Sequence, residues 1–198
     1  MASKTLSFYV TDLKQDATVM LIFDPFSGSD SEPFPFLDFY KVKFPVVWRV
    51  IKFRAGGRAK ATVTYLPRLA FGHAQTNDDN VVTVAKWVEL QSGDTAAATG
   101  KNRTTQSDGT RFIKVDADGE HFEPVLLCTG VRANSNVTTQ FTPTLSAYVT
   151  RDYEKSQYLR GEVESEAIWV QNLNLLEEHT SWSFRDDEET GCFSIERT

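Results

Sequence analysis

The stretch that decides the fold is VVWRVIKFRAGGRAKATVTYL, residues 46–66. From Arg58 onward its polar side chains alternate with small or apolar ones, and a period of two is typical of a strand with one buried face. The run before the glycines is rich in β-branched and aromatic residues, which favour strands. Gly56 and Gly57 can adopt positive φ, so we predict a β-hairpin that turns at residues 55–57.

The first run of this stretch does not alternate cleanly. Arg49 and Ile51 would share one face of the strand, and Val50 and Lys52 would share the other. An extra residue in one strand of a pair shifts the phase of its side chains. We therefore expect a bulge or a bend near these four residues.

The rest of the chain reads as short strands separated by turns and polar loops. Strand-forming runs occupy residues 5–10, 18–23, 81–90, 111–116, 121–127, 144–150, 168–173, 181–184 and 192–195. Only residues 151–160 and 172–179 suit short helices. Nine or ten strands with so little helix predict an all-β fold, an antiparallel β-sandwich. A single jelly roll with short helices in its loops is the first choice.

Length and composition favour one globular unit. The 198 residues suit a single domain, with N-terminal strands and a loop in residues 1–40 and the main sandwich in residues 41–198. Hydrophobic residues make up 40% of the chain and aromatic residues 12%, which is enough for a core. The net charge of −6 argues against a protein whose whole surface binds nucleic acid.

Cysteine content and apolar runs indicate the compartment. Two cysteines, Cys128 and Cys192, cannot make a disulfide framework, and we interpret both as reduced thiols. The N-terminal residues lack the apolar core of a signal peptide, and no run is long enough to span a bilayer. We expect an intracellular protein with no membrane partner.

No catalytic motif is found in the sequence. It lacks a nucleophile elbow, a P-loop, a dinucleotide-binding fingerprint and the helical zinc-protease motif. The three histidines, His73, His121 and His179, are scattered, and none has metal-ligand spacing to a cysteine. We therefore expect neither an enzyme nor a cofactor, although a site assembled from distant residues would leave no linear motif.

One short acidic motif is similar to part of a calcium loop. Asp116, Asp118 and Glu120 form D-x-D-G-E. The later bidentate carboxylate of an EF-hand is missing, and a hairpin turn explains the Asp-Gly step. We interpret the motif as a turn, and calcium held between neighbouring subunits is the form in which a metal site would remain.

Charge is segregated along the chain. Residues 41–77 contain eight basic side chains and no acid, whereas residues 162–196 are rich in Asp and Glu. Three interpretations remain open. The two segments are solvated surfaces, or complementary patches that meet between copies, or the basic segment contacts nucleic-acid phosphates while the acidic segment faces away.

These two segments supply the candidate contact residues. The candidates for RNA-facing or subunit contacts are Lys41, Lys43, Lys52, Arg54, Arg58 and Lys60. The acidic contact candidates are Asp186, Asp187, Glu188 and Glu189.

Three segments carry a resemblance to a known family: FRAGGRAKATVTYLP (53–67), VVTVAKWVEL (81–90) and TPTLSAYVTRD (142–152). In pattern they resemble the jelly-roll coat proteins of small non-enveloped positive-strand RNA viruses, such as sobemovirus-like and tymovirus-like particles. Many of these carry a basic N-terminal arm, but the first forty residues here hold only Lys4 and Lys14. The chain is therefore more similar to armless coat proteins of tymovirus-like or barnavirus-like particles.

The resemblance implies a structural capsid protein. Such a protein assembles with many copies of itself into a shell that encloses viral RNA, largely without sequence preference. It resides in the virion, and in the host cytoplasm before assembly. RNA would contact the inner face of the shell, where the candidates are Lys52, Arg54, Arg58 and Lys60.

An alternative from a different class is a cytoplasmic carbohydrate-binding β-sandwich, a lectin of the kind found in fungi. Its site would use the tryptophans with nearby Asp and Asn side chains. The candidates are Trp48, Trp87, Trp169 and Trp182. They stand mostly inside strand patterns, where packing in the core is the usual role.

Overall fold

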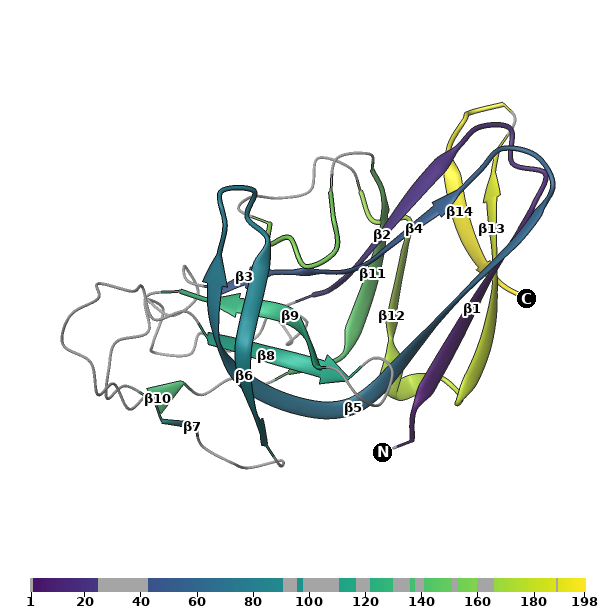
Figure 1. Ribbon diagram of the computed structural model, residues 1–198. Coiled ribbons are helices and arrows are strands. Elements are labelled where there is room, and N and C mark those ends of the chain that lie inside the picture. Colours follow the sequence, from purple (N-terminus) through teal and green to yellow (C-terminus); the bar gives the residue numbers. More distant parts are fainter. Residues whose placement is uncertain are drawn as a thin grey trace.

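The computed structural model of the protein describes residues 2–24, 43–90, 96–97, 111–116, 122–129, 136–137, 141–150, 153–159, 166–187 and 189–198. Within these residues the regular elements are strands and one 3₁₀ turn (Figure 1). They are β1 (Lys4–Thr11), β2 (Ala17–Phe23), β3 (Lys43–Pro45), β4 (Val47–Phe53), β5 (Arg58–Thr76), β6 (Val82–Leu90), β7 (Ala96–Ala97), β8 (Arg111–Asp116), β9 (Phe122–Cys128), β10 (Asn136–Val137), β11 (Thr144–Val149), β12 (Trp169–Asn172), the 3₁₀ turn η2 (Leu173–Leu175), β13 (His179–Asp186) and β14 (Phe193–Arg197). The all-β class is confirmed.

Two layers of four strands enclose the main core. One layer is the sheet β12-β11-β2-β4, and the other is the β14-β13-β1-β5 part of a larger sheet. Apolar side chains from all eight strands form one buried cluster between the layers. Phe53 of β4 stacks on Phe184 of β13, with ring centroids 5.4 Å apart. These curled layers agree with the predicted β-sandwich.

Residues 46–66 do not form a hairpin, so that prediction is wrong. β4 pairs with β2, whereas β5 pairs with β1 in the opposite layer. Gly56 and Gly57, with φ of 71° and 74°, turn the chain from one layer to the other. Both strands have an apolar face, and this arch points both faces into the same core. Strand alternation defines those faces but does not name the neighbouring strand.

The connection between β1 and β2 is a second arch that lies against the first. The N–H of Asp12 donates to the carbonyl of Gly57 at 2.7 Å, and the N–H of Gly56 donates to the carbonyl of Leu13 at 2.8 Å. The pairs β1–β5 and β2–β4 are therefore one antiparallel ribbon folded across the core.

β5 is long because it serves two sheets in succession. Its first half pairs with β1, and its second half pairs with β6 and β8. The register to β8 shifts between Leu66 and Leu69, around Pro67, which has no N–H to donate. Beyond this point β5, β6, β8, β9 and β3 form a curled extension of the sandwich (Figure 1). β8 and β9 pair antiparallel, as the Asp-Gly step predicted.

The predicted irregularity in the first run is confirmed. In the β2–β4 pair, Leu21 lies opposite Arg49 and Ile22 lies opposite Val47, which leaves Trp48 as the extra residue. A bulge re-aims side chains without ending the strand. The Trp48 side chain is fully buried in the main core.

One strand pair departs from the antiparallel pattern, and the described residues form no α-helix in the two segments where helices were predicted. β1 pairs with β13 in parallel, so the neighbours are not antiparallel throughout. The described part of residues 151–160 forms a turn and isolated bridges from Gln157 and Tyr158 instead of a helix. Residues 172–179 contain only the single turn η2. In residues 153–159, backbone groups that a helix would pair internally are bonded to distant parts of the chain. In residues 172–179, the chain leaves the turn η2 and continues into β13.

A charged cluster joins β4, β9 and the segment 153–159. One carboxylate oxygen of Glu123 accepts from Trp48 Nε1 at 3.0 Å and pairs with Arg49, and the other oxygen pairs with Lys155. The side chains of Glu123 and Arg49 are only 13% and 16% exposed. These two charged side chains are poorly solvated. If either one lost its partner, water would compensate for little of the lost interaction.

We expect Glu123→Gln to lower the free energy of unfolding by about 3 kcal/mol, because Arg49 loses its carboxylate in a poorly solvated site. Glu89→Gln is the matched control. Glu89 pairs with Arg68 at 2.8 Å, but both side chains are more than 40% exposed, so a loss below about 1 kcal/mol is expected. Urea unfolding of both variants measures the difference, and equal losses would contradict the structural role of Glu123.

The buried phenol of Tyr65 predicts alkaline destabilisation. Burial raises the pKa of Tyr65 to about 12, whereas an unfolded chain has a tyrosine pKa of about 10. The stability from the neutral phenol is complete below pH 10 and is lost as the pH rises to 12, by about 2–3 kcal/mol. We expect Tyr65→Phe to weaken the pH dependence of the urea midpoint in this window. An unchanged dependence would exclude Tyr65 as its source.

Candidate functional site

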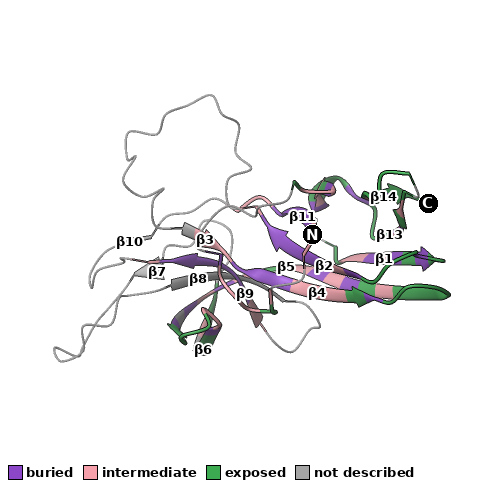
Figure 2. Ribbon diagram, turned by 90° about the horizontal axis from the view of Figure 1, so that it is seen from above, coloured by how far each residue is buried: buried purple, intermediate pink, exposed green. Residues whose placement is uncertain are grey.

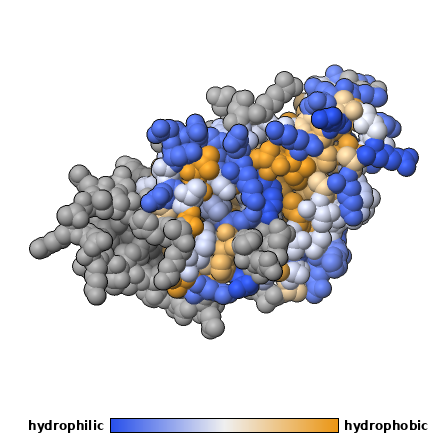
Figure 3. Space-filling view, in the orientation of Figure 1, coloured by the Kyte–Doolittle hydropathy of each residue, from blue (hydrophilic) through white to orange (hydrophobic). Residues whose placement is uncertain are grey.

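Three connections between strands meet at one end of the sandwich. β1 runs parallel to β13 and antiparallel to β5, so the end of β1, the end of β13 and the start of β5 lie together (Figure 1, upper right). We call this region the arch end and define it as residues 12–16, 54–57 and 189–192. All of these residues except Leu13 are exposed (Figure 2). Figure 3 shows hydrophilic residues gathered there and an apolar area nearer the middle of the visible face.

The basic candidates are spread over both layers. Lys52 lies on the outer side of β4 together with Val50, which packs against a cluster outside the main core. Lys60 lies on the outer side of β5, in the opposite layer. Arg54 is in the arch and Arg58 starts β5, and both are exposed. The arch separates Lys52 from Lys60, so Arg58 and Lys60 are the described basic candidates that share the outer side of β5.

Two other cations of the basic segment are paired within the chain. Arg49 meets Glu123, and Arg68 makes two hydrogen bonds of 2.8 Å to the carboxylate of Glu89. The basic segment is therefore not one positive surface.

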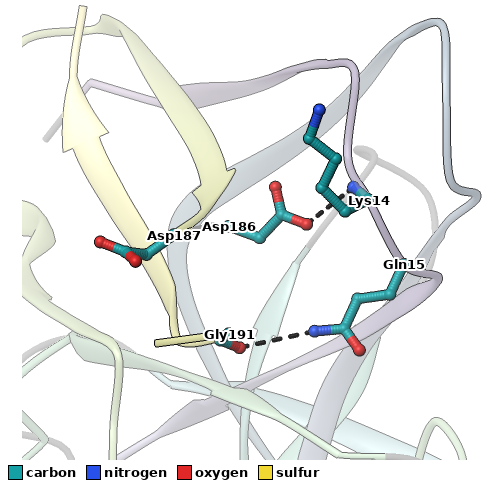
Figure 4. A pocket seen from close by; sticks show the side chains of 5 residues that line it. All are labelled: Lys14, Gln15, Asp186, Asp187 and Gly191. Carbon is teal, nitrogen blue, oxygen red and sulfur yellow. Dashed lines mark hydrogen bonds between the residues drawn. The ribbon is translucent and has the colours of Figure 1, made fainter. Parts of the chain in front are cut away.

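Of the acidic candidates that the structure describes, Asp186 and Asp187 lie beside the arch end and Glu189 belongs to it. The carboxylate of Asp186 accepts from the backbone N–H of Lys14 at 2.7 Å, and the Gln15 amide donates to the carbonyl of Gly191 at 3.4 Å. These contacts border an open hollow of about 310 Å³ (Figure 4). Only β1 separates β13 from β5, so the two charged segments are about 10 Å apart across the sheet.

Asp187 shapes the turn that follows β13. Its carboxylate accepts from the backbone N–H groups of Thr190 and Glu189, both at 2.8 Å, and these bonds lower the pKa of Asp187. The side chain points away from Lys14 and Gln15 in Figure 4. The carboxylate therefore holds its own turn together, and Asp186 is the acid tied to the neighbouring arch.

The metal candidates receive no support from the described residues. Within them, no group of three or more His, Cys, Asp or Glu side chains is placed to hold a metal ion.

Lys43 and Asp116 are described only by their positions in β3 and β8. The candidates outside the described residues are Lys41, Asp118, Glu120 and Glu188.

The outer side of the β14-β13-β1-β5 layer is a polar surface, which we call the hydroxyl face. Every second residue of these strands points away from the core, and most of them are Ser or Thr. Its residues are Thr5, Ser7, Tyr9 and Thr11 of β1, Arg58, Lys60, Thr62 and Thr64 of β5, His179, Ser181, Ser183 and Arg185 of β13, and Ser194 and Glu196 of β14.

Tyr9 is the aromatic side chain of the hydroxyl face. It is 40% exposed, whereas its neighbour Phe8 is 2% exposed and belongs to the core. The Lys60 ammonium lies 5.1 Å from the centroid of the Tyr9 ring. The nearby Lys60 ammonium, and to a smaller degree the hydroxyls of Ser181 and Ser7, lower the pKa of Tyr9. The sequence analysis missed Tyr9, although alternation in residues 4–11 already places it opposite Phe8.

The tryptophans proposed for sugar binding lie in the interior. Trp48, Trp169 and Trp182 are at most 5% exposed and belong to the main core. Trp169 and Trp182 make an edge-to-face contact with centroids 5.0 Å apart. Trp87 is half-buried against a second apolar cluster. These rings are packed against protein, so a sugar could not stack on the three buried ones without opening the sandwich.

Comparison with protein-family models, with curated proteins and with solved structures finds no match for this chain. In the part of the chain that the structure describes, no helix has the length and apolar character needed to cross a membrane. The arch end and the hydroxyl face are therefore interpreted from their own chemistry.

Proposed function

We propose that this chain is a structural coat protein, a jelly roll that assembles in many copies into a shell around RNA. The observation that carries the proposal is the meeting of oppositely charged residues at the arch end and in the strand ends beside it. Arg54 and Arg58 lie on one side of the β1–β2 arch, and Asp186 and Glu189 lie on the other. Adjacent positive and negative halves complement the same surface of a second copy turned by a two-fold rotation.

The jelly-roll part of the proposal rests on the folded ribbon. Two layers of four strands, with the β1–β5 and β2–β4 pairs folded together across the core, have the strand number and double-layer form of that architecture. The parallel β1–β13 pair is a departure from its antiparallel pattern.

The position of β1 gives its residues a structural role. β1 begins at Lys4 and lies between β13 and β5 in the middle of its layer. A central strand is held by hydrogen bonds on both sides, so residues 4–11 cannot serve as a mobile RNA-binding arm. We assign RNA contact to a folded surface, the hydroxyl face, which has three exposed cations, Arg58, Lys60 and Arg185, next to hydroxyl donors. Arginine, lysine, serine and threonine side chains are common donors to phosphate oxygens.

The carbohydrate-binding alternative has less support. Three of its four candidate tryptophans are buried in the main core, and sugar stacking needs an exposed ring. Tyr9 is exposed, but it lies beside Lys60 on a face that also contains Arg58 and Arg185. That surface suits an anionic polymer better than a neutral sugar.

The first test is the mass, shape and nucleic-acid content of the purified protein. Light scattering after size exclusion, negative-stain microscopy and the 260/280 nm absorbance ratio together identify RNA-filled shells. We expect closed particles that contain RNA. A monomer or dimer at every salt concentration and pH would overturn the proposal.

A matched pair of charge reversals tests the RNA-facing layer. We expect Lys60→Glu, and more strongly Arg58→Glu with Lys60→Glu, to reduce the RNA content of the particles, because phosphate contacts become repulsive. Lys52→Glu makes the same change on the opposite layer and should leave RNA content near that of the wild type. Equal RNA content in all variants would remove this face from RNA contact.

A further inference from the structure

The hydroxyl face is built around Tyr9. Its cross-strand partners are Ser183 on β13 and Lys60 on β5, and Ser7 and Thr11 precede and follow it on the same side of β1. Three of these four neighbours have short hydroxyl side chains. These short side chains do not cover the ring, so Tyr9 remains 40% exposed to solvent.

The Tyr9 ring lies next to the Lys60 side chain. The Lys60 ammonium lies 5.1 Å from the ring centroid, and Lys60, Ser181 and Ser7 together lower the pKa of Tyr9. Ser7 precedes Tyr9 by two residues on the same side of β1, and Ser181 lies opposite Ser7. A tyrosine side chain has only two rotatable χ angles, so it loses little conformational freedom when a flat partner stacks on its ring.

Cations lie on both sides of the ring. Arg58 and Lys60 are on β5, and Arg185 is on β13, with the two strands about 10 Å apart. Glu196 at the β14 edge is the acid of this face among the described residues. A second copy of the same face would meet like charges, whereas a phosphodiester chain that crosses the strands would meet cations before and after Tyr9.

We propose that the hydroxyl face binds single-stranded RNA, with Tyr9 stacking on one unpaired base and Arg58, Lys60 and Arg185 contacting the flanking phosphates. The inference rests on the proposed RNA contact and names the form of RNA and the residue that holds it. An aromatic ring with neighbouring cations is the usual way to bind single strands without sequence preference. A duplex hides the faces of its bases inside the stack, so Tyr9 would have no ring to contact.

The binding test uses the full chain under conditions that keep it unassembled. The probe is a fluorescein-labelled oligouridylate of roughly 12 nucleotides, within the range of about 4–16 that single-strand sites cover. Fluorescence anisotropy gives the Kd at several salt concentrations. Unlabelled oligouridylate should compete with the probe, and an RNA duplex of equal length should compete poorly.

Two variants at one position separate stacking from charge. We expect Tyr9→Leu to raise the Kd by about 5- to 150-fold with an unchanged salt dependence, because it removes one stacked base. Tyr9→Phe keeps the ring and should bind close to the wild type. Lys60→Glu should instead reduce the slope of log K against log salt by about 0.7, because one phosphate contact is lost. Thermal unfolding of each variant checks that it is folded.

The outcomes separate this inference from the proposed function. RNA-filled particles together with unaltered oligonucleotide binding by Tyr9→Leu would overturn the stacking role and leave the coat protein in place. Tyr9-dependent binding by a protein that never forms particles would support the inference and overturn the proposal that the chain forms a shell. Equal competition by the duplex, or binding of a neutral polysaccharide at the same face in place of RNA, would overturn the inference.

Discussion

The structure depends on one two-stranded ribbon that folds across the core at a pair of hydrogen-bonded arches. Bonds between Asp12 and Gly57 and between Gly56 and Leu13 join the two connections, so each arch supports the other. Because both strands cross between layers, the same ribbon supplies apolar side chains to both walls of the core. Positive φ at the two glycines lets this sharp bend occur without strain from a Cβ atom.

The ribbon also organises the surface. In β1, Phe8 points into the core and Tyr9 points to solvent, so the pairing that buries one aromatic ring displays the other. The parallel neighbour β13 brings the acidic turn to the same end as the basic arch. Core packing thus sets the distance between charged segments that lie more than a hundred residues apart in the chain.

Much of the local structure could be predicted from the sequence, and the candidate site only in part. The strand runs are confirmed, and the imperfect phase around residues 49–52 correctly indicated a bulge, because alternation is a property of neighbouring residues. The two helices were wrong, since residues 153–159 bridge to Val46 and Val81. Arg58 and Lys60 do share a face, but Lys52 lies on the other layer.

By itself, the sequence determined which residues form strands, which side of each strand is apolar, and that Tyr9 belongs to a polar side. The tertiary structure decided that β4 joins β2, that β5 joins β1 and then β8, and that β13 lies parallel to β1. The reason is physical. Side-chain alternation follows directly from the order of consecutive residues, whereas backbone hydrogen bonds are nearly the same for every residue type. Partners are therefore chosen by how all the apolar faces fit into one core.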